Sequence, residues 1–310
     1  MTSRVVVSAP ATIANLGPGF DIFGLAIAEP ADVVEVSSAA EGVRISDISG
    51  VGSEKIPRDP ARNSATVAAM RVAEMLDATL SAEFSIRKGV KPNGGLGSSG
   101  ASAAAGAVAA NELLGGELTK EQLIEAAAFA EGEVAGAKHY DNVSPAILGG
   151  FVVIAGDPPK FVKLSPPEMK IVVAQPDIEL PTRKGRQVLP ERVKLRDAVA
   201  NAGRASAMAA AVSKGDLKLF GEQMIDSIAE PARSHLIPGF AEVKRAALEA
   251  GALGAAMAGA GPAVFAVLEP EEPHEEVAKA MREAFEEAGV GCKTFITSPG
   301  RGVEVVLKEE

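Results

Sequence analysis

The hydrophobic pattern divides the chain into many short strands and several helices of moderate length. Runs of β-branched and other apolar residues predict strands at residues 4–10, 32–36, 42–46, 83–87, 151–154, 171–174, 263–268 and 303–307. Apolar residues at helical spacing predict helices at residues 63–76, 98–110, 194–213, 216–228, 239–250 and 273–288, and another that begins at a capping box, Thr119 to Gln122. This mixture of elements favours an α+β fold in which helices cover sheets.

A cluster of prolines indicates where the chain divides. Pro158-Pro159 and Pro166-Pro167 precede a new strand at residue 170, and proline is disfavoured in helix interiors and central strands. We therefore expect an N-terminal domain of residues 1–160 and a C-terminal domain of residues 161–310, a usual division for a chain of 310 residues.

The most informative polar stretch is the glycine-rich loop at residues 91–101, KPNGGLGSSGA. Pro92 and the glycines at 94, 95 and 97 cannot sustain a helix or a central strand, and the small residues that follow predict a tightly packed helix capped by Ser98 or Ser99. Unpaired N–H groups at such a helix start attract an anion, most often a phosphate. A tight turn that only caps a core helix would use the same residues, so the loop alone leaves both interpretations open.

Two better-known phosphate motifs do not fit this loop. Residues 95–100 match the G-x-G-x-x-G pattern of dinucleotide-binding oxidoreductases, but the polar segment 87–93 stands where that motif needs the end of a hydrophobic strand. The Gly-Lys-Ser/Thr ending of the P-loop is absent as well. The sequence therefore predicts a third kind of phosphate loop.

A single carboxylate interrupts the apolar face of the helix that begins at Thr119. Glu131 follows Ile124 by two helical turns, which places it in line with the apolar positions 124, 127 and 128. A carboxylate there must be paired, hydrogen-bonded or bound to a cation, and a phosphate loop needs Mg²⁺ nearby, which favours a metal ligand. The alternative is a helix that ends near residue 130 and leaves Glu131 in solvent.

Other polar side chains gather in turns. Asn15 and Asp21 flank a Gly-Pro-Gly turn, where they either cap the turn or face a ligand. Arg233 lies among turn residues, either as a surface charge or as a clamp for a carboxylate.

The segment 136–145 combines several functional groups between a helix and a strand, which suggests a site: Lys138, His139, Asp141 and Asn142. His139 has no Cys or His close by in the sequence, so we do not expect it to bind a metal.

Composition narrows the choice of partners. The formal net charge of −10 argues against nucleic acid or an anionic membrane as the main partner. One cysteine, Cys292, excludes an internal disulfide and fits a reducing cytoplasm, and we see no signal peptide. The uncharged segment 250–268 is rich in Ala and Gly with a proline inside, so we interpret it as a helix end, a loop and a strand rather than a membrane span.

Several blocks in order along nearly the whole chain resemble the GHMP small-molecule kinases. Residues 92–101 resemble their phosphate loop, residues 8–21 their first motif and residues 256–265 their third, a glycine loop that closes against the phosphate site. Within that superfamily, residues 15–21, 138–151 and 233–239 are together typical of the homoserine kinases. The resemblance implies a two-layer α+β N-terminal domain that binds ATP, a ferredoxin-like C-terminal domain, and an active site between them.

The resemblance also implies roles for individual residues. Ser99 and Glu131 would hold Mg²⁺, and the nucleotide would lie against Asn63, Lys88, Lys91, Pro92, Gly94, Gly95, Leu96, Gly97, Ser98, Ser99, Gly100 and Ala101. The L-homoserine substrate would be bound by Asn15, Asp21, His139 and Asp141 at its amino and hydroxyl end and by Arg186 and Arg233 at its carboxylate. In the basic loop expected at residues 182–186, Arg183 occupies a position where the family commonly has a smaller residue, which leaves the choice between Arg183 and Arg186 open.

The implied reaction is phosphoryl transfer from ATP to the homoserine hydroxyl, on the route to threonine, by an enzyme that is commonly a dimer. Many relatives have an aspartate where Asn142 stands, and an amide cannot accept the hydroxyl proton. The transition state is loose, so we expect Asn142 to orient the hydroxyl, with catalysis carried by positioning and charge neutralisation. Alternatives are another GHMP kinase, such as a mevalonate kinase, and a non-catalytic metabolite-binding protein of the same fold.

Overall fold

The first of two sheets joins both ends of the chain in the computed structural model, which describes residues 2–310. Its seven strands follow the order β11–β1–β2–β4–β3, with the β5–β6 hairpin added on β2. The strands are β1 Arg4–Ala14, β2 Phe23–Ser38, β3 Val43–Gly50, β4 Ala82–Lys88, β5 Phe151–Ala155, β6 Lys160–Leu164 and β11 Glu304–Glu309. Only the β3–β4 pair is parallel within this sheet of the described residues.

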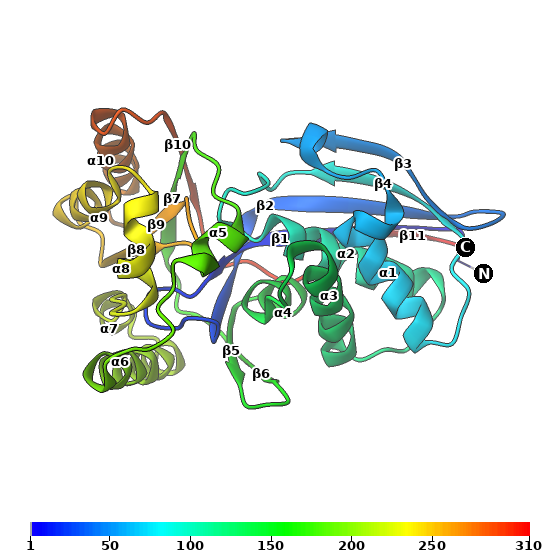
Figure 1. Cartoon of the computed structure of the whole chain (residues 1–310), viewed down its shortest axis with the longest axis horizontal. Helices are drawn as coiled ribbons and strands as arrows, with labels where there is room; N and C mark the ends of the chain where they lie inside the picture. The colour runs from blue at the N-terminus through cyan, green and yellow to red at the C-terminus, as the bar shows by residue number, and fades with distance from the viewer. Residues whose placement is uncertain (1) are drawn as a thin grey trace.

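Four helices form the second layer of this N-terminal unit (Figure 1): α1 Ser64–Met75, α2 Ser98–Leu113, α3 Lys120–Ala135 and α4 Tyr140–Leu148. The short 3₁₀ turns Ser53–Lys55 and Pro60–Arg62 lead into α1. Almost every residue of α2 is buried, because α2 packs on β1 and β2 and is itself covered by α1 and α3. Its small residues permit this closeness: a Cβ at Gly106 would overlap the backbone of Ala65 on α1.

The second sheet is antiparallel and has the strand order β10–β7–β9–β8. Its strands are β7 Lys170–Pro176, β8 Gly254–Met257, β9 Val264–Leu268 and β10 Cys292–Thr297. One face carries α9 Phe240–Glu249 and α10 His274–Glu287, and the other carries α6 Leu195–Lys214 and α7 Leu217–Glu222. Numbered within this unit, the order is 4-1-3-2 with two helices on one face, which confirms the expected ferredoxin-like domain.

Short helices occupy the junction between the two units. They are α5 Thr182–Gln187, α8 Ala229–Arg233 and the 3₁₀ turn Ser234–Leu236. In Figure 1, α5 lies near the centre of the molecule, between the second sheet and the helices of the N-terminal unit. The sequence indicated a basic loop at 182–186; residues 182–187 form one short helical stretch instead.

The ends of the two predicted domains need correction. The strand expected near residues 303–307 exists, but as β11 it pairs antiparallel with β1 and completes the sheet of the first unit. A boundary at residue 160 would also cut the β5–β6 hairpin. Both differences have one cause. The alternation of residues along a segment can predict a strand, but which strand it pairs with depends on the whole fold.

Several local expectations also changed. β1 continues through residues 11–14, beyond the strand expected at residues 4–10, and residues 140–148, in the segment expected between a helix and a strand, form the helix α4. The helix expected at 216–228 ends at Glu222, because the Asp226 carboxylate accepts three backbone N–H groups, from residues 228 to 230, and starts α8 anew. No helix within residues 2–310 is long and apolar enough to cross a membrane, and residues 250–268 run from the end of α9 through β8 to β9.

Candidate active site

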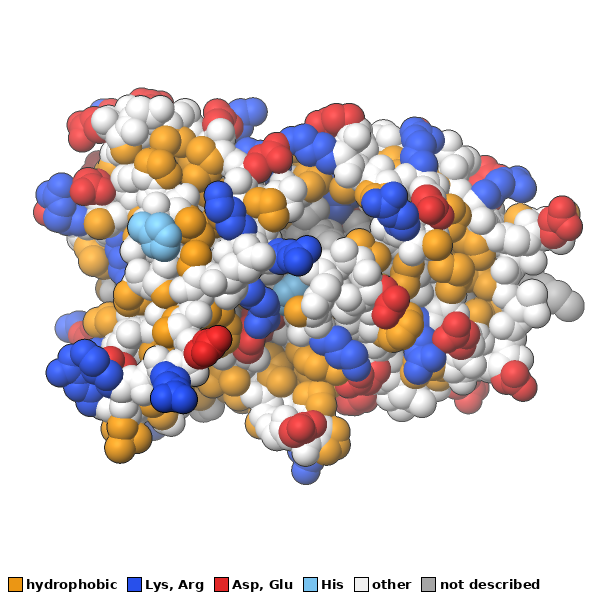
Figure 2. All heavy atoms as spheres, viewed as in Figure 1, with side chains coloured by type: hydrophobic (Ala, Val, Ile, Leu, Met, Phe, Trp, Pro, Cys, Tyr) orange, Lys and Arg blue, Asp and Glu red, His pale blue; other side chains and the backbone are white. Residues whose placement is uncertain are grey.

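A cleft of about 940 Å³ opens between the two units. Its walls come from the glycine-rich loop, the end of α3, the start of α4, α5 and the loop 259–261. Figure 2 shows basic side chains around the hollow near the centre of this face. The glycine-rich loop, the segment with His139 and Asn142, and the basic segment with Arg186 therefore border one cleft.

The glycine-rich loop can take its shape only with glycine at two positions. Gly95 and Gly97 have φ values of +85° and +66°, a region that residues with a Cβ seldom adopt. A Cβ at Gly95 would lie 2.9 Å from the backbone of Gly261 in the third glycine loop. A Cβ at Gly97 would overlap the side chains of Thr12 and Asn142. The loop thus lies pressed between the two units, and Gly94, Gly95 and Gly97 border the cleft.

The start of α2 differs from the expectation in one detail. Its N-cap is Gly97, and neither Ser98 nor Ser99 caps the helix. The Ser98 hydroxyl instead donates to the Val90 carbonyl at 2.8 Å, across the base of the loop. The first N–H groups of α2 have no partner within the helix, so they remain available to an anion in the cleft.

A buried charge cluster joins the two ends of the loop. The Lys88 ammonium pairs with the Asp32 carboxylate, and these side chains are 1% and 0% exposed. Lys88 also donates to the Ser98 carbonyl at 3.0 Å and to the Ser102 hydroxyl at 2.7 Å. Asp32 accepts in addition from the N–H groups of residues 89 and 90, at 3.0 Å each, and from Ser102 at 2.7 Å.

This cluster changes the interpretation of Lys88. Although Lys88 borders the cleft, its ammonium is directed to Asp32 at the base of the loop. We therefore assign it to positioning of the loop, in place of direct contact with a nucleotide. Lys91 is nearby but faces Asp177, at 3.8 Å, on the outer side of the loop.

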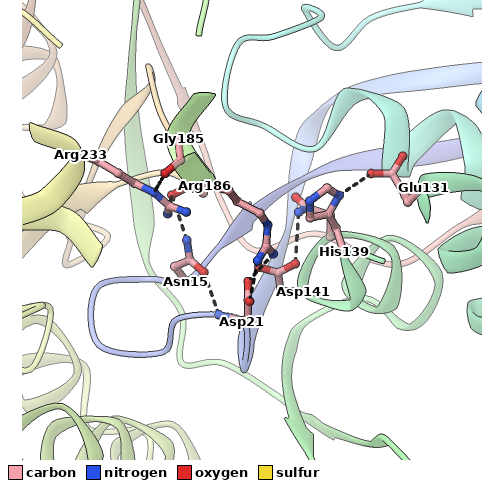
Figure 3. Close-up of polar contacts among 10 residues, drawn as sticks. Asn15, Asp21, Glu131, His139, Asp141, Gly185, Arg186 and Arg233 are labelled. Carbon is pink, nitrogen blue, oxygen red and sulfur yellow. Dashed lines mark hydrogen bonds and ion pairs between the residues drawn. The ribbon is translucent and has the colours of Figure 1, made fainter. Parts of the chain in front are cut away.

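Glu131 is 2% exposed on α3, as the periodicity of that helix indicated, and the alternative of a solvated end is wrong because α3 continues to Ala135. Its Oε2 lies 3.0 Å from His139 Nδ1 (Figure 3). Burial lowers the pKa of His139, but the hydrogen bond to Glu131 and the charge of Glu131 outweigh it and raise the pKa. Glu131 Oε1 and His139 Nε2 are buried without a hydrogen-bond partner in residues 2–310.

An unpartnered carboxylate oxygen fits a cation site. Across the described residues no three His, Cys, Asp or Glu side chains converge to hold a metal, so Glu131 would act with few protein ligands. Mg²⁺ is usually held in this way, by one or two carboxylates together with phosphates and water. Ser99, on the first turn of α2, borders the same cleft and offers a hydroxyl oxygen.

Four charged and amide side chains meet on the other side of His139 (Figure 3). Arg186 on α5 forms two hydrogen bonds with Asp21, Nη2 to Oδ1 at 2.8 Å and Nη1 to Oδ2 at 3.1 Å. Asn15 accepts from the Asp21 N–H at 3.0 Å and donates to the Gly259 carbonyl at 2.9 Å. Arg233 also donates to Gly259, at 3.2 Å, and to Gly185 at 3.0 Å.

Asp141 and Asn142 lie on the first turn of α4, between the metal candidate and this group. Asp141 is buried, and burial and then the charge of Asp21 raise its pKa to about 6, against the opposing effects of His139 and Arg186. The Asn142 Oδ1 accepts from the Thr12 hydroxyl at 3.0 Å, and its Nδ2 lies 3.3 Å from Asp141 Oδ1. Asn142 is thus held by two partners beside Gly97 of the phosphate loop.

The structure brings most of the predicted residues together. Those that border the cleft are Asn63, Lys88, Pro92, Gly94, Gly95, Gly97, Ser98, Ser99, Glu131, His139, Asn142 and Arg186. Asn63 also caps α1 by accepting from the Ala65 N–H. Leu96, Gly100 and Ala101 are buried in the packing behind the loop. Arg186 is the arginine that reaches Asp21, whereas Arg183 is exposed on α5.

Sequence reasoning missed four contributors. Three of them act through the hydrogen bonds described above: Asp32 and Ser102 hold the loop, and Thr12 holds Asn142. The fourth is Phe20, whose ring centre lies 5.8 Å from the guanidinium carbon of Arg186 and 5.2 Å from that of Arg233. Asp32 had a detectable signal, because it shares the buried face of its strand with Val34 and Val36. Thr12 had none, since every residue from Ala9 to Ala14 is buried.

Comparison with known proteins agrees with this arrangement. Residues 63–150 match the family model "GHMP kinases N terminal domain" and residues 208–287 match "GHMP kinases C terminal". A homoserine kinase of Halorubrum lacusprofundi is 45% identical over 98% of this chain and 100% of its own length. One of Pyrococcus abyssi is 41% identical over 96% of this chain and 98% of its own length.

Solved structures give the same result. The crystal structure of homoserine kinase from Cytophaga hutchinsonii superposes with a TM-score of 0.93 at 36% identity, over 99% of this chain and 98% of the other. A mevalonate kinase of L. major, at 19% identity and a TM-score of 0.73 over 97% of each chain, shares the fold. The expected α+β kinase fold is confirmed, and the chain belongs to the homoserine kinase family of the GHMP kinases.

Proposed function

We propose that this protein transfers the γ-phosphoryl group of ATP to the hydroxyl of L-homoserine, giving O-phospho-L-homoserine for threonine synthesis. The observation that carries the proposal is the group of opposite charges beside the phosphate loop. Two carboxylates, Asp21 and Asp141, suit an ammonium, and two guanidinium groups, Arg186 and Arg233, suit a carboxylate. An α-amino acid carries an ammonium and a carboxylate group on the same carbon, whereas mevalonate has no ammonium.

Within this proposal, each part of the cleft has a task. The N–H groups of the glycine-rich loop and the start of α2 would bind the ATP phosphates. Ser99 and Glu131 would hold Mg²⁺, which supplies positive charge to the phosphoryl group in transfer. His139, with its unpartnered Nε2, would meet the hydroxyl end of the substrate. Thr12 and Asp141 hold the Asn142 amide, which would orient that hydroxyl.

The direct test is ADP release from Mg-ATP with a panel of L-homoserine, L-serine, L-threonine, mevalonate and galactose. A clear preference for L-homoserine is the expected result. Release with mevalonate or galactose would discard the amino-acid pocket and keep the phosphate loop. Binding of ATP without turnover of any compound would favour a metabolite-binding protein, and binding of NAD in place of ATP would favour an oxidoreductase.

Replacing Asn142 by Ala should lower kcat for L-homoserine by about 10- to 100-fold, because a misplaced hydroxyl attacks poorly even when ATP and metal are in place. The KM for ATP should change little, since Asn142 lies beside the phosphate loop but forms its side-chain hydrogen bonds with Thr12 and Asp141, outside the loop. Steady-state kinetics of both substrates separates these effects. A loss of only a few-fold in kcat would show that Asn142 does not orient the hydroxyl.

Activity should fall on the acid side with an apparent pKa near 6. The raised pKa of Asp141, about 6, means that this carboxyl group is increasingly protonated below that pH and no longer attracts an ammonium. We expect kcat/KM for L-homoserine to fall by about tenfold per pH unit below 6. A flat profile between pH 5 and pH 7 would contradict the assignment.

The free energy of unfolding should fall as pH rises through about 6, opposite to the activity, which should rise. Because the pKa of Asp141 is higher in the folded protein than in the unfolded chain, the protonated carboxyl stabilises the fold, and this contribution is lost as pH rises through about 6. Urea unfolding of the wild type and of Asp141→Asn at pH 5 and pH 7 should show a larger loss on raising the pH for the wild type.

We further propose that the protein acts as a homodimer in the cytoplasm. Exposed apolar side chains on the first turns of α6, Leu195 at 79% and Val199 at 62%, support a buried contact there. The single cysteine, Cys292, is free and suits a reducing compartment. Light scattering after gel filtration tests the first point, since a mass of one chain would contradict it.

A further inference from the structure

The Asp21–Arg186 ion pair joins the two groups that would bind opposite ends of the substrate. Asp21 belongs to the loop between β1 and β2, and Arg186 to α5, 165 residues further along the chain. Their bonds, at 2.8 and 3.1 Å, use both guanidinium Nη atoms and both carboxylate oxygens. This fork geometry is the one that a substrate carboxylate would need from Arg186. The pair therefore occupies the position that substrate binding must open.

The charges around the Asp21–Arg186 pair make it unfavourable to move one partner away without replacing it. Asp141 is buried beside Asp21, and after burial itself the charge of Asp21 is the largest cause that raises the pKa of Asp141, while Arg186 lowers it. On the other side, Arg233 and Arg186 both lie over the ring of Phe20. If Arg186 leaves Asp21 without replacement, two carboxylates face each other without their guanidinium partner. If Asp21 leaves Arg186, the two arginines lose the nearest negative charge.

We propose that the Asp21–Arg186 pair is an internal substitute for a zwitterion, which an amino-acid substrate replaces group for group. This inference rests on the proposed function. The substrate ammonium takes the place of Arg186 at Asp21 and Asp141, and the substrate carboxylate takes the place of Asp21 at Arg186. A ligand with a carboxylate alone has to separate the pair and leave Asp21 uncompensated. The pair thus selects zwitterions against hydroxy acids of the same length.

The pair is suited to exchange because it is half-exposed. The side chains of Arg186 and Asp21 are 32% and 41% exposed, so water screens the pair and its separation costs little when both charges find new partners. The scaffold around it stays in place: Asn15 holds the Asp21 backbone N–H, and Arg233 holds the Gly185 carbonyl beside Arg186. Opening therefore requires movement of two side chains, with no rearrangement of the loops.

The test uses a ligand that lacks the ammonium, 4-hydroxybutanoate, which is homoserine without its amino group. In Asp21→Asn, Arg186 has no competing carboxylate, so we expect the Kd of 4-hydroxybutanoate, measured by ligand-detected NMR, to fall by about fivefold against the wild type. The backbone tolerates this change, since Asp21 has a φ of +57° and asparagine is favoured there. If Asp21 only bound the substrate ammonium, the Kd of 4-hydroxybutanoate would not change.

A matched control removes the same charge from a comparable pair elsewhere. Glu83 on β4 pairs with Arg44 on β3, with Glu83 33% exposed, and neither residue borders the cleft. Glu83→Gln should leave the Kd of 4-hydroxybutanoate unchanged, so an equal gain in both variants would reduce the effect to net charge and overturn the proposal. The reciprocal variant, Arg186→Gln, should bind 3-aminopropan-1-ol about fivefold more tightly, which keeps the test open if Asp21→Asn does not fold.

The outcomes separate this inference from the proposed function. A wild-type protein that does not phosphorylate L-homoserine would overturn the function, whatever the ligand affinities. A wild type active on L-homoserine, with an Asp21→Asn variant whose Kd for 4-hydroxybutanoate is unchanged or higher, would overturn the exchange of ion pairs alone.

Discussion

Replacing Glu131 by Gln should lower kcat for L-homoserine phosphorylation by about 100-fold or more. Glu131 is buried in the cleft, and its Oε1 has no hydrogen-bond partner among the described residues. Glutamine in its place is neutral and lacks the negative charge that a hard cation needs. Loss of one electrostatic contact to the transition state commonly costs two to three orders of magnitude in rate. The measurement is ADP release as a function of Mg²⁺ concentration, where we expect the variant to need more Mg²⁺ as well.

Glu133→Gln is the matched control, since Glu133 lies two residues further along α3 at the mouth of the same cleft and is exposed. This variant removes the same charge and should keep kcat within about twofold, because an exposed charge is screened by solvent and salt. Near-normal turnover in Glu131→Gln, with an unchanged Mg²⁺ requirement, would remove Glu131 from the metal site.

Replacing Asp32 by Asn should destabilise the protein by about 3–5 kcal/mol, because it leaves the Lys88 ammonium buried without a counter-charge. The same change should raise the KM for ATP, since Lys88, Ser98 and Ser102 hold the two ends of the phosphate loop around Asp32. Urea unfolding followed by circular dichroism measures the first effect, and steady-state kinetics well below the unfolding range measures the second.

Two further variants test whether the loss of stability in Asp32→Asn comes from the buried ion pair. Glu35→Gln on the same strand breaks a half-exposed pair with Arg4 and should cost less than about 1 kcal/mol. The double variant Asp32→Asn with Lys88→Met removes both buried charges and should recover part of the lost stability, because breaking a buried pair costs more than replacing it. Equal destabilisation by Asp32→Asn and Glu35→Gln would contradict a special role of the buried cluster.

Glu131 and Asp32 show which buried carboxylates the sequence pattern could and could not explain. Both are carboxylates on the apolar face of an amphipathic element, Glu131 at helical spacing and Asp32 at the two-residue spacing of a strand. Glu131 was found because its helix is long and its apolar stripe is regular. Asp32 has a comparable local signal on its strand, but its role does not follow from that signal, because its partner Lys88 lies 56 residues further along the chain and no local pattern joins the two.

The arginines illustrate the same limit. The sequence placed Arg186 in a basic loop and left two candidates for one role, since charge and composition are alike at Arg183 and Arg186. The turn of α5 directs Arg186 to Asp21 and leaves Arg183 exposed. The partner of Arg186, Asp21, lies 165 residues earlier in the chain, and Gly185 beside it packs against Ala260, so both contacts join segments far apart in the sequence.

Short stretches of the sequence suffice to predict most of the local structure: most helices and strands, the capping box at Thr119, and a glycine-rich loop that only glycine can form at Gly95 and Gly97. These features depend on backbone conformation and on periodicity, both of which a short stretch of residues contains. Three features became visible only in the folded protein: the return of β11 to the first sheet, the pairing of Lys88 with Asp32, and the pairing of Arg186 with Asp21. Such pairings depend on where distant segments meet, because a charge or a strand edge is stabilised only by the partner that the whole fold places beside it.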